Sequence, residues 1–306
     1  MMSTLERRPR AHAAPPPDRW LRGLDAELRA LAMLQQAEAE AAHNQAQAAA
    51  LSKAARAEMH YRTLGMDVAG IAAFHRTLAS EDAAARMALR QATVPPARQF
   101  DALGRGDDRE WIAGSEHGRC PHPIRLESDH VLRRSASARG TGTGWFGSGT
   151  EQACHTDFWH FPWTPAVSGW YTFRPVVTFS GLYIVQAAHD FWTSKEARAA
   201  IRFTLHHWQG VWKVPARPDP PGAAGTLWER GGTNVSECVG MNWEHVPSGP
   251  GIRTVPFTAG EPALISVQLT LHATARGEGS FAEVGAAGEG GALACRSLLG
   301  AYTLGR

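Results

Sequence analysis

The segment ISVQLTLHAT, residues 265–274, alternates an apolar and a polar residue at every position. Because successive side chains of a strand point to opposite faces of a sheet, this pattern puts all the apolar residues on one face. Those residues are Ile265, Val267, Leu269, Leu271 and Ala273. Gly277 and Gly279 follow, and residues 280–284 offer a returning strand. The segment therefore predicts a half-buried antiparallel strand.

Further short strand-like segments, separated by turn signals, fill the sequence beyond residue 158. We expect strands near residues 170–179, 182–187, 201–208, 225–230, 233–239, 252–257 and 293–302. Ser180-Gly181 separates the first two and predicts a hairpin, and residues 194–200 predict a short helix or turn. No helix of crossover length is expected between these strands. The pattern favours an antiparallel β-sandwich or jelly roll over a parallel sheet.

The N-terminal part of the sequence is typical of helices. Leucines recur at spacings of three and four after a possible N-cap at Asp18, and about half of residues 37–57 are alanine. We therefore expect one helix over residues 18–64. Gly65 predicts its C-terminal cap, and shorter helices over 68–79 and 81–92 are expected to fold back on the first helix.

The shorter helices have too few apolar residues to cover the whole apolar stripe of the first helix. The remaining surface, which is rich in alanine, would need another chain or domain, since small residues favour close helix packing. We therefore expect homo-oligomerisation, in the manner of a coiled coil, through residues 18–93. A monomeric helical hairpin is the alternative.

These patterns divide the chain into four parts and predict an α+β fold. The parts are a disordered leader over residues 1–17, a helical module over 18–93, a connector with irregular strands over 94–157, and an antiparallel β-sandwich over 158–306. The leader is rich in arginine and proline, which cannot bury apolar area.

Composition excludes several classes of protein. The chain has 31 basic and 29 acidic residues and a formal net charge of +2, so it lacks the basic surface that nucleic-acid binding requires. We find no signal peptide and no stretch apolar enough to span a membrane. The four cysteines, Cys120, Cys154, Cys238 and Cys295, are scattered, which favours reduced thiols and a cytoplasmic location. Release by a non-classical route stays open.

One glycine-rich segment matches the letters of a cofactor motif. Residues 142–147, GTGWFG, fit the dinucleotide-binding fingerprint. The fingerprint requires a buried strand before the glycines and a helix after them, and the flanking residues predict neither. We therefore expect a glycine loop and no cofactor.

The metal candidates are similarly weak. Cys120, His122, Cys154 and His155 are the residues best suited to ligate a metal, but their spacing is looser than that of zinc sites. We expect no bound metal, and a metal-dependent enzyme is the second alternative function. The common hydrolase and phosphate-loop motifs are absent, so we predict no catalytic residues.

Aromatic residues carry the functional hypothesis. Ten of the eleven tryptophans lie after the helical part, and residues 158–163, FWHFPW, put aromatic side chains on both faces of a strand. One face is expected to bind a sugar ring or a partner protein. The predicted ligand-binding residues are Trp159, Phe161, Trp163, Trp192 and Trp208.

The sequence therefore predicts a non-enzymatic binding or structural protein, in which an oligomerising helical module presents a β-sandwich. The first alternative is a pore-forming, toxin-like protein in which the long helical region enters a bilayer.

Overall fold

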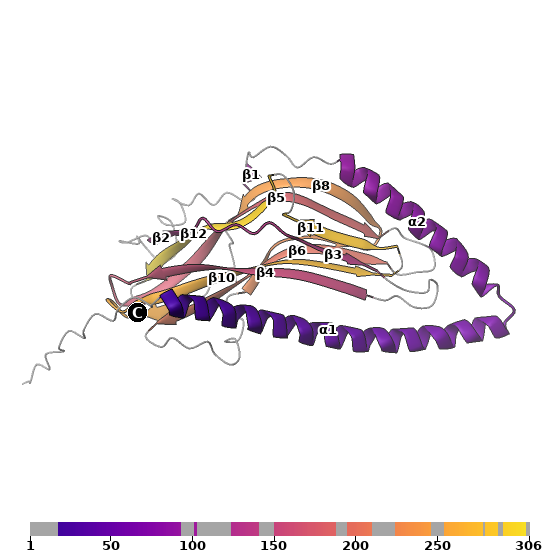
Figure 1. The fold of residues 1–306 in the computed structure, drawn as a ribbon, viewed down its shortest axis with the longest axis horizontal. Coiled ribbons are helices and arrows are strands. Elements are labelled where there is room, and N and C mark those ends of the chain that lie inside the picture. Colours follow the sequence, from indigo (N-terminus) through magenta and orange to yellow (C-terminus); the bar gives the residue numbers. More distant parts are fainter. Residues whose placement is uncertain are drawn as a thin grey trace, which may run out of the picture.

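The computed structural model describes residues 18–92, 101–102, 124–140, 150–187, 195–209, 224–245, 254–277, 279–286 and 290–303. Two N-terminal helices are followed by mostly antiparallel β-sheets (Figure 1). The expected leader, residues 1–17, lies outside the described residues.

Helix α1 (Asp18–Thr63) confirms the long helix predicted from the sequence. The turn after it contains Gly65, whose φ of 77° lies in the left-handed region that glycine adopts without strain. Asp67 then caps the next helix, α2 (Val68–Ala92), because its Oδ1 accepts a hydrogen bond of 2.9 Å from the backbone N–H of Gly70.

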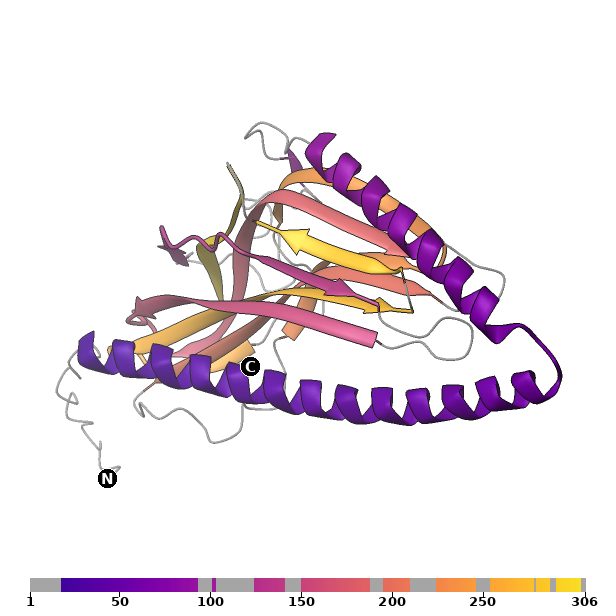
Figure 2. The ribbon, with the colours of Figure 1, turned by 45° about the vertical axis from the view of Figure 1, so that its right-hand side comes forward.

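Two expectations about α2 are wrong. The separate helices expected over 68–79 and 81–92 are one continuous helix, because no glycine or proline interrupts residues 71–92. The helices also do not fold back on each other. They diverge from their turn as a V, and the sheets lie between the two arms (Figures 1 and 2). The first part of α1 packs on a sheet instead of on α2.

The strands form two sheets. The four-stranded sheet has the order β4-β10-β6-β7, with β4 (Thr150–Trp163), β10 (Ala263–Arg276), β6 (Glu196–Gln209) and β7 (Ala224–Gly232). The eight-stranded sheet consists of β1 (Asp101–Ala102), β2 (Ile124–Glu127), β3 (Ser135–Arg139), β5 (Gly169–Ala187), β8 (Val235–His245), β9 (Thr254–Phe257), β11 (Phe281–Gly285) and β12 (Ala292–Thr303). Every pair is antiparallel except β1 with β8.

Strand β10 contains the segment that decides the fold. It pairs with β4 on one side and β6 on the other, so that Leu269 lies opposite Asp157 and Phe203. Its alternate apolar residues, 265, 267, 269, 271 and 273, are all buried in a core to which both sheets contribute. The predicted in-and-out alternation is confirmed for this face.

Strand β5 corrects another expectation, because it runs through Ser180-Gly181 without the predicted hairpin. A Cβ at Gly181 would lie 2.0 Å from the carbonyl oxygen of Gly285 on β11. The glycine therefore permits a close approach between strands and does not form a turn. The first half of β5 pairs with β9 and β12, and the second half pairs with β8 and β11.

The sheets begin earlier in the chain than the expected sandwich. Strands β2 and β3 precede residue 158, and the boundary expected between residues 157 and 158 falls inside β4. Residues 196–200, expected as a short helix or turn, are the first residues of β6.

Candidate functional site

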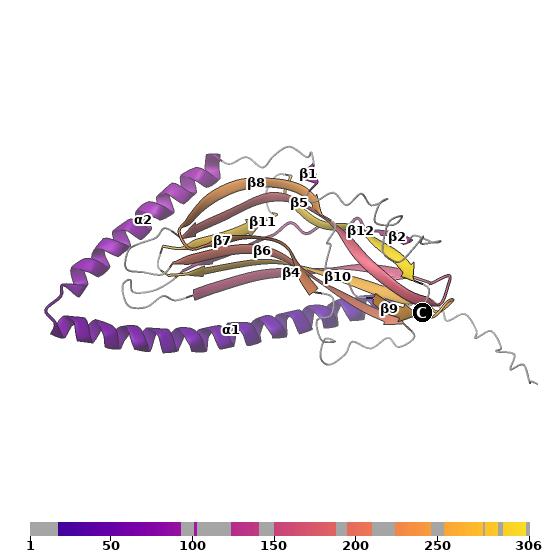
Figure 3. The ribbon, with the colours of Figure 1, turned by 180° about the vertical axis from the view of Figure 1, so that it is seen from behind.

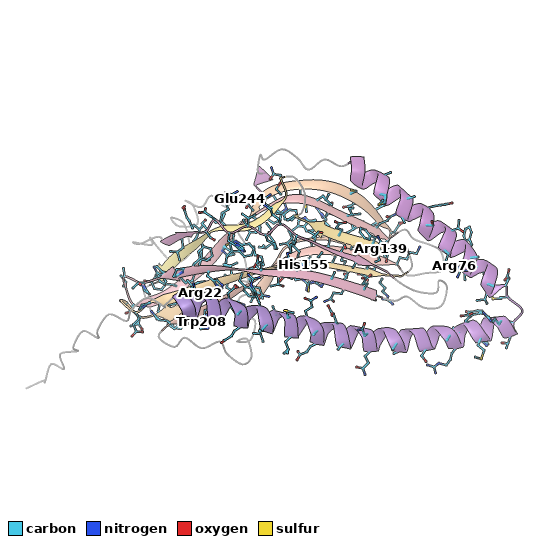
Figure 4. The ribbon with its side chains drawn as sticks, viewed as in Figure 1. Arg22, Arg76, Arg139, His155, Trp208 and Glu244 are labelled. Carbon is cyan, nitrogen blue, oxygen red and sulfur yellow. The ribbon has the colours of Figure 1, made fainter. Side chains whose placement is uncertain are left out.

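The candidate site lies where the start of α1 crosses the four-stranded sheet. Leu24 and Leu28, four residues apart and therefore on one side of the helix, are each 2% exposed. They pack on Phe158 of β4, Leu264 of β10 and Trp208 of β6. Figure 4 shows Trp208 beside the first turns of α1. This apolar contact fixes the helix on the outer face of the sheet.

A first polar chain extends from α1 into the sheet. The guanidinium Nε of Arg29 donates to Asp25 Oδ2 at 2.7 Å, and His160 Nε2 lies 3.2 Å from Asp25 Oδ1. Since an ionised carboxylate can only accept, Nε2 donates to Asp25, and Nδ1 forms a hydrogen bond with the hydroxyl of Ser266. The chain joins α1, β4 and β10.

A second polar chain starts at the same arginine. Arg29 Nη2 donates to Asp157 Oδ1 at 2.6 Å, and His130 Nε2 donates to Asp157 Oδ2 at 2.8 Å. The backbone N–H of Phe158 adds a third hydrogen bond to this buried carboxylate, at 3.0 Å. Arg29 therefore bridges two aspartates, one on its own helix and one on β4.

The charges at the junction stabilise each other. Burial alone would raise the pKa of Asp25, but the hydrogen bonds from Arg29 and His160 outweigh it, so the pKa lies below its usual value. The hydrogen bond to Asp25, with a further one to Asp157, raises the pKa of Arg29 above its usual value despite burial. Both residues are therefore charged at neutral pH.

Asp25, His160 and Ser266 have the residue types of a hydrolytic triad. A nucleophile must reach its substrate, whereas Ser266 is 0% exposed and lies on the central strand beneath α1. The Ser266 hydroxyl therefore has no route to a substrate in this structure. The arrangement anchors the helix and supplies no accessible nucleophile.

Further histidines on the four-stranded sheet are held neutral. His206 Nε2 donates to Gln268 Oε1 at 3.0 Å, and burial lowers the pKa of His206. Burial lowers the pKa of His272 to about 4. His155 also has a lowered pKa, first because of burial and then because of Arg134. None of these three imidazoles carries a charge at neutral pH.

The predicted aromatic residues do not form an exposed face. Trp159 and Phe161 are buried in the core between the sheets, and Trp208 is buried under α1. Trp163 packs edge to face on Tyr171, with their ring centroids 4.9 Å apart. Exposure is not observed because the second sheet covers the face of β4 that carries Trp159 and Phe161, while Phe158 on the other face packs against α1. Trp192 lies outside the described residues, and ligand binding by this set stays a prediction.

The weak metal candidates separate into two groups. Cys120 and His122 lie outside the described residues. Cys154 and His155 are neighbours on β4, where successive side chains point to opposite faces. Burial, with a smaller contribution from Glu40, raises the pKa of the Cys154 thiol. In the part of the chain that the structure describes, no three histidine, cysteine, aspartate or glutamate side chains gather closely enough to hold a metal ion.

Sequence reasoning missed the residues that make the junction. Asp25 and Arg29 are an i,i+4 pair of opposite charge, a signal visible in the sequence. Asp157 and His130 carry no such signal, because Asp157 lies 128 positions from Arg29 and 27 positions from His130.

Of the described helices, neither has an 18-residue stretch apolar enough to cross a bilayer.

Comparison of the sequence with models of protein families finds no match, and no curated protein sequence matches it.

Proposed function

We propose that this chain is a non-enzymatic binding or structural protein that self-associates through a helical arm, residues 33–92. The two sheets form a β-sandwich in this proposal, and the junction with α1 holds the arm in a fixed direction. The observation that carries the proposal is the exposure of large apolar side chains along the arm. Met33, Leu34, Met59, Leu64, Phe74 and Met87 are between 58% and 71% exposed.

Exposed apolar side chains at this density favour a protein partner. Single exposed apolar residues are ordinary on a protein surface, but six large ones, on two diverging helices and the turn between them, indicate a surface that is buried on assembly. Five of the six are methionine, leucine or phenylalanine side chains in the helices themselves, and Leu64 lies in the turn. Flexible methionines suit helix–helix packing, whereas sugar rings are bound by flat aromatic surfaces.

The absence of an accessible nucleophile at the junction favours a non-enzymatic role. The most reactive-looking triad of side chains in the described residues has its serine buried and serves to hold α1 against the sheet. A carbohydrate or protein ligand of the sandwich stays a prediction, and the burial of Trp159, Phe161 and Trp208 weighs against these side chains as its contact surface.

The test measures the mass of the full chain by size-exclusion chromatography with light scattering. We expect an oligomer, and we expect the double variant Leu34→Glu, Met59→Glu to shift it toward monomer. The matched control is Thr226→Glu, which adds a charge at an exposed position of β7. A parent chain that stays monomeric at every concentration would overturn the proposal. Dye release from liposomes by the parent, lost in the double variant, would support the membrane-active alternative instead.

A further inference from the structure

One face of α1 beyond the junction is exposed over its whole length. Positions three or four apart lie on the same side of a helix. The residues on this side, here called the outer face, are Leu34, Glu38, Ala41, Gln45, Ala48, Ser52, Ala55, Arg56 and Met59, and all are exposed. Large apolar side chains lie near its two ends, and small or polar side chains lie between them.

The position of α1 leaves this side of the molecule open. In Figures 1 and 3, the part of α1 beyond the junction runs along one border of the molecule, and no other described helix or strand lies beyond this part. The sheets and α2 all lie on the other side of α1. A second chain could therefore approach the outer face along its full length.

We propose that the outer face binds the outer face of a second copy of this chain, with the two α1 helices antiparallel and a two-fold axis between residues 46 and 47. This inference rests on the proposed function and adds the partner and its orientation. In this register Leu34 of each copy packs on Met59 of the other copy. The two large apolar residues of the outer face then cover each other at both ends of the contact.

Charge complementarity selects the antiparallel orientation. Residues 30–50 contain Glu38 and Glu40 and no lysine or arginine, whereas residues 51–62 contain Lys53, Arg56 and Arg62 with one glutamate. Glu38 and Arg56 are 18 positions apart, which is about five helical turns, so they lie on the same flank of α1. A two-fold axis brings like flanks together, and Glu38 then faces Arg56 of the other copy. A parallel pair in register would instead bring opposite flanks together, with Glu38 level with Glu38 of the other copy and about 27 Å along the axis from Arg56.

The middle of the outer face suits close packing. Ala41, Ala48 and Ala55 recur every seven residues, and small side chains let helix axes approach to about 8 Å. The segment from Leu34 to Met59, along which the two helices touch, is about 39 Å long at 1.5 Å per residue. A contact of this length buries the alanine-rich surface that neither the sheets nor α2 covers.

The first test reverses charges in the full chain and measures the dimer dissociation constant. Glu38→Arg and Arg56→Glu are each expected to weaken the dimer about tenfold, because each turns two attractive pairs into repulsive ones. The double variant Glu38→Arg, Arg56→Glu restores both pairs and is expected to restore the affinity. Glu27→Arg, on an exposed position of α1 before the outer face, is the matched control and is expected to change little.

The second test uses cysteine cross-linking. A mixture of the Leu34→Cys and Met59→Cys chains is expected to form a disulfide-linked dimer under mild oxidation, whereas neither variant alone exceeds the background of the parent chain. Cross-linking of each variant with itself would show a parallel pair and overturn the inference. If the chain forms an oligomer whose affinity the charge reversals do not change and in which the two cysteine variants do not cross-link, the inference is overturned. The proposed self-association would still stand. A strictly monomeric parent would overturn both.

Discussion

The start of α1 packs on the four-stranded sheet, whereas most described side chains in the rest of the same helix are exposed. Residues 24–32 bury Leu24 and Leu28 on the four-stranded sheet, and Arg29 bridges two aspartates there. Leu34 and Met59 lie on the same helix and are mostly exposed. Burying a leucine contributes about 1.5–3 kcal/mol, so the first part is held by the chain itself. The second part can gain the same stabilisation only from a partner.

The attachment of residues 18–32 of α1 to the four-stranded sheet is here called the anchor. Its polar contacts make it specific as well as stable. The contact of Leu24 and Leu28 with the sheet is apolar and not directional, whereas Arg29 must lie between Asp25 and Asp157. Moving α1 by one turn would leave the buried Asp157 carboxylate with fewer partners, and a buried charge without its partner is costly. The anchor therefore sets both the register and the direction of the helical arm.

The largest difference in stability between the sheets and the helical arm is expected for one matched pair of substitutions. Leu269 is 0% exposed at the centre of the core and Leu34 is 58% exposed on the arm. At a dilution at which the chain is monomeric, we expect Leu269→Ala to lower the free energy of unfolding by about 3 kcal/mol, and Leu34→Ala to change it by less than about 0.5 kcal/mol. Chemical denaturation followed by tryptophan fluorescence measures both. Equal losses would show that the arm is part of the folded core.

The next largest effect is expected at the anchor. Leu28→Ala removes a side chain buried against Phe158 and Trp208, which we expect to weaken the docking of α1 by about 2 kcal/mol. Amide hydrogen exchange over residues 18–32 should become faster while exchange in β10 stays unchanged. Leu34→Ala is again the matched control. A loss of protection in β10 as well would mean that α1 and the sheet unfold together.

Local periodicity was sufficient to predict the elements that have a regular apolar pattern of their own. The alternation of residues 265–274 identified β10 and its buried face, and the leucine spacing with the alanine-rich segment identified α1. The same reasoning failed at Ser180-Gly181, where the glycine permits the close approach of Gly285, which is more than 100 positions away. It also failed between the helices expected over 68–79 and 81–92, where α2 continues through Ser80, since serine is tolerated inside a helix when no breaker follows.

The junction was less predictable than the fold. An aromatic run on a strand indicates that both faces meet something, but the sequence does not say whether that is solvent, a ligand or another part of the chain. Here one face of residues 158–163 meets the second sheet, and Phe158 meets α1. Asp157 was not identified because its importance depends on Arg29, which only the folded chain brings close.

A smaller effect, of opposite sign at two sites, is expected from glycine substitutions in the helical part. Gly65 has a φ of 77°, so Gly65→Ala should strain the turn and destabilise the start of α2 by about 1 kcal/mol. Gly23 lies inside α1 with nothing within 4 Å of an added Cβ, so Gly23→Ala should stabilise α1 by about 0.5–1 kcal/mol. Hydrogen exchange in α1 and α2 measures both. The same sign at both sites would contradict the observed turn.

The smallest expected effect is a pH dependence of the anchor and not of the arm. Because the pKa of Asp25 is lower in the folded chain than its ordinary value near 4, its contribution is complete above that value. It is lost as the pH falls through the lower folded value, where the carboxylate is protonated and no longer pairs with Arg29 and His160. Protection factors for residues 18–32 should therefore be higher in the parent than in Asp25→Asn at neutral pH, and the difference should disappear in acid. Glu27→Gln, an exposed substitution in the same turn, is the control and should show no such difference. A difference between parent and Asp25→Asn that persists unchanged in strong acid would mean that Asp25 anchors α1 by packing and not by its charge.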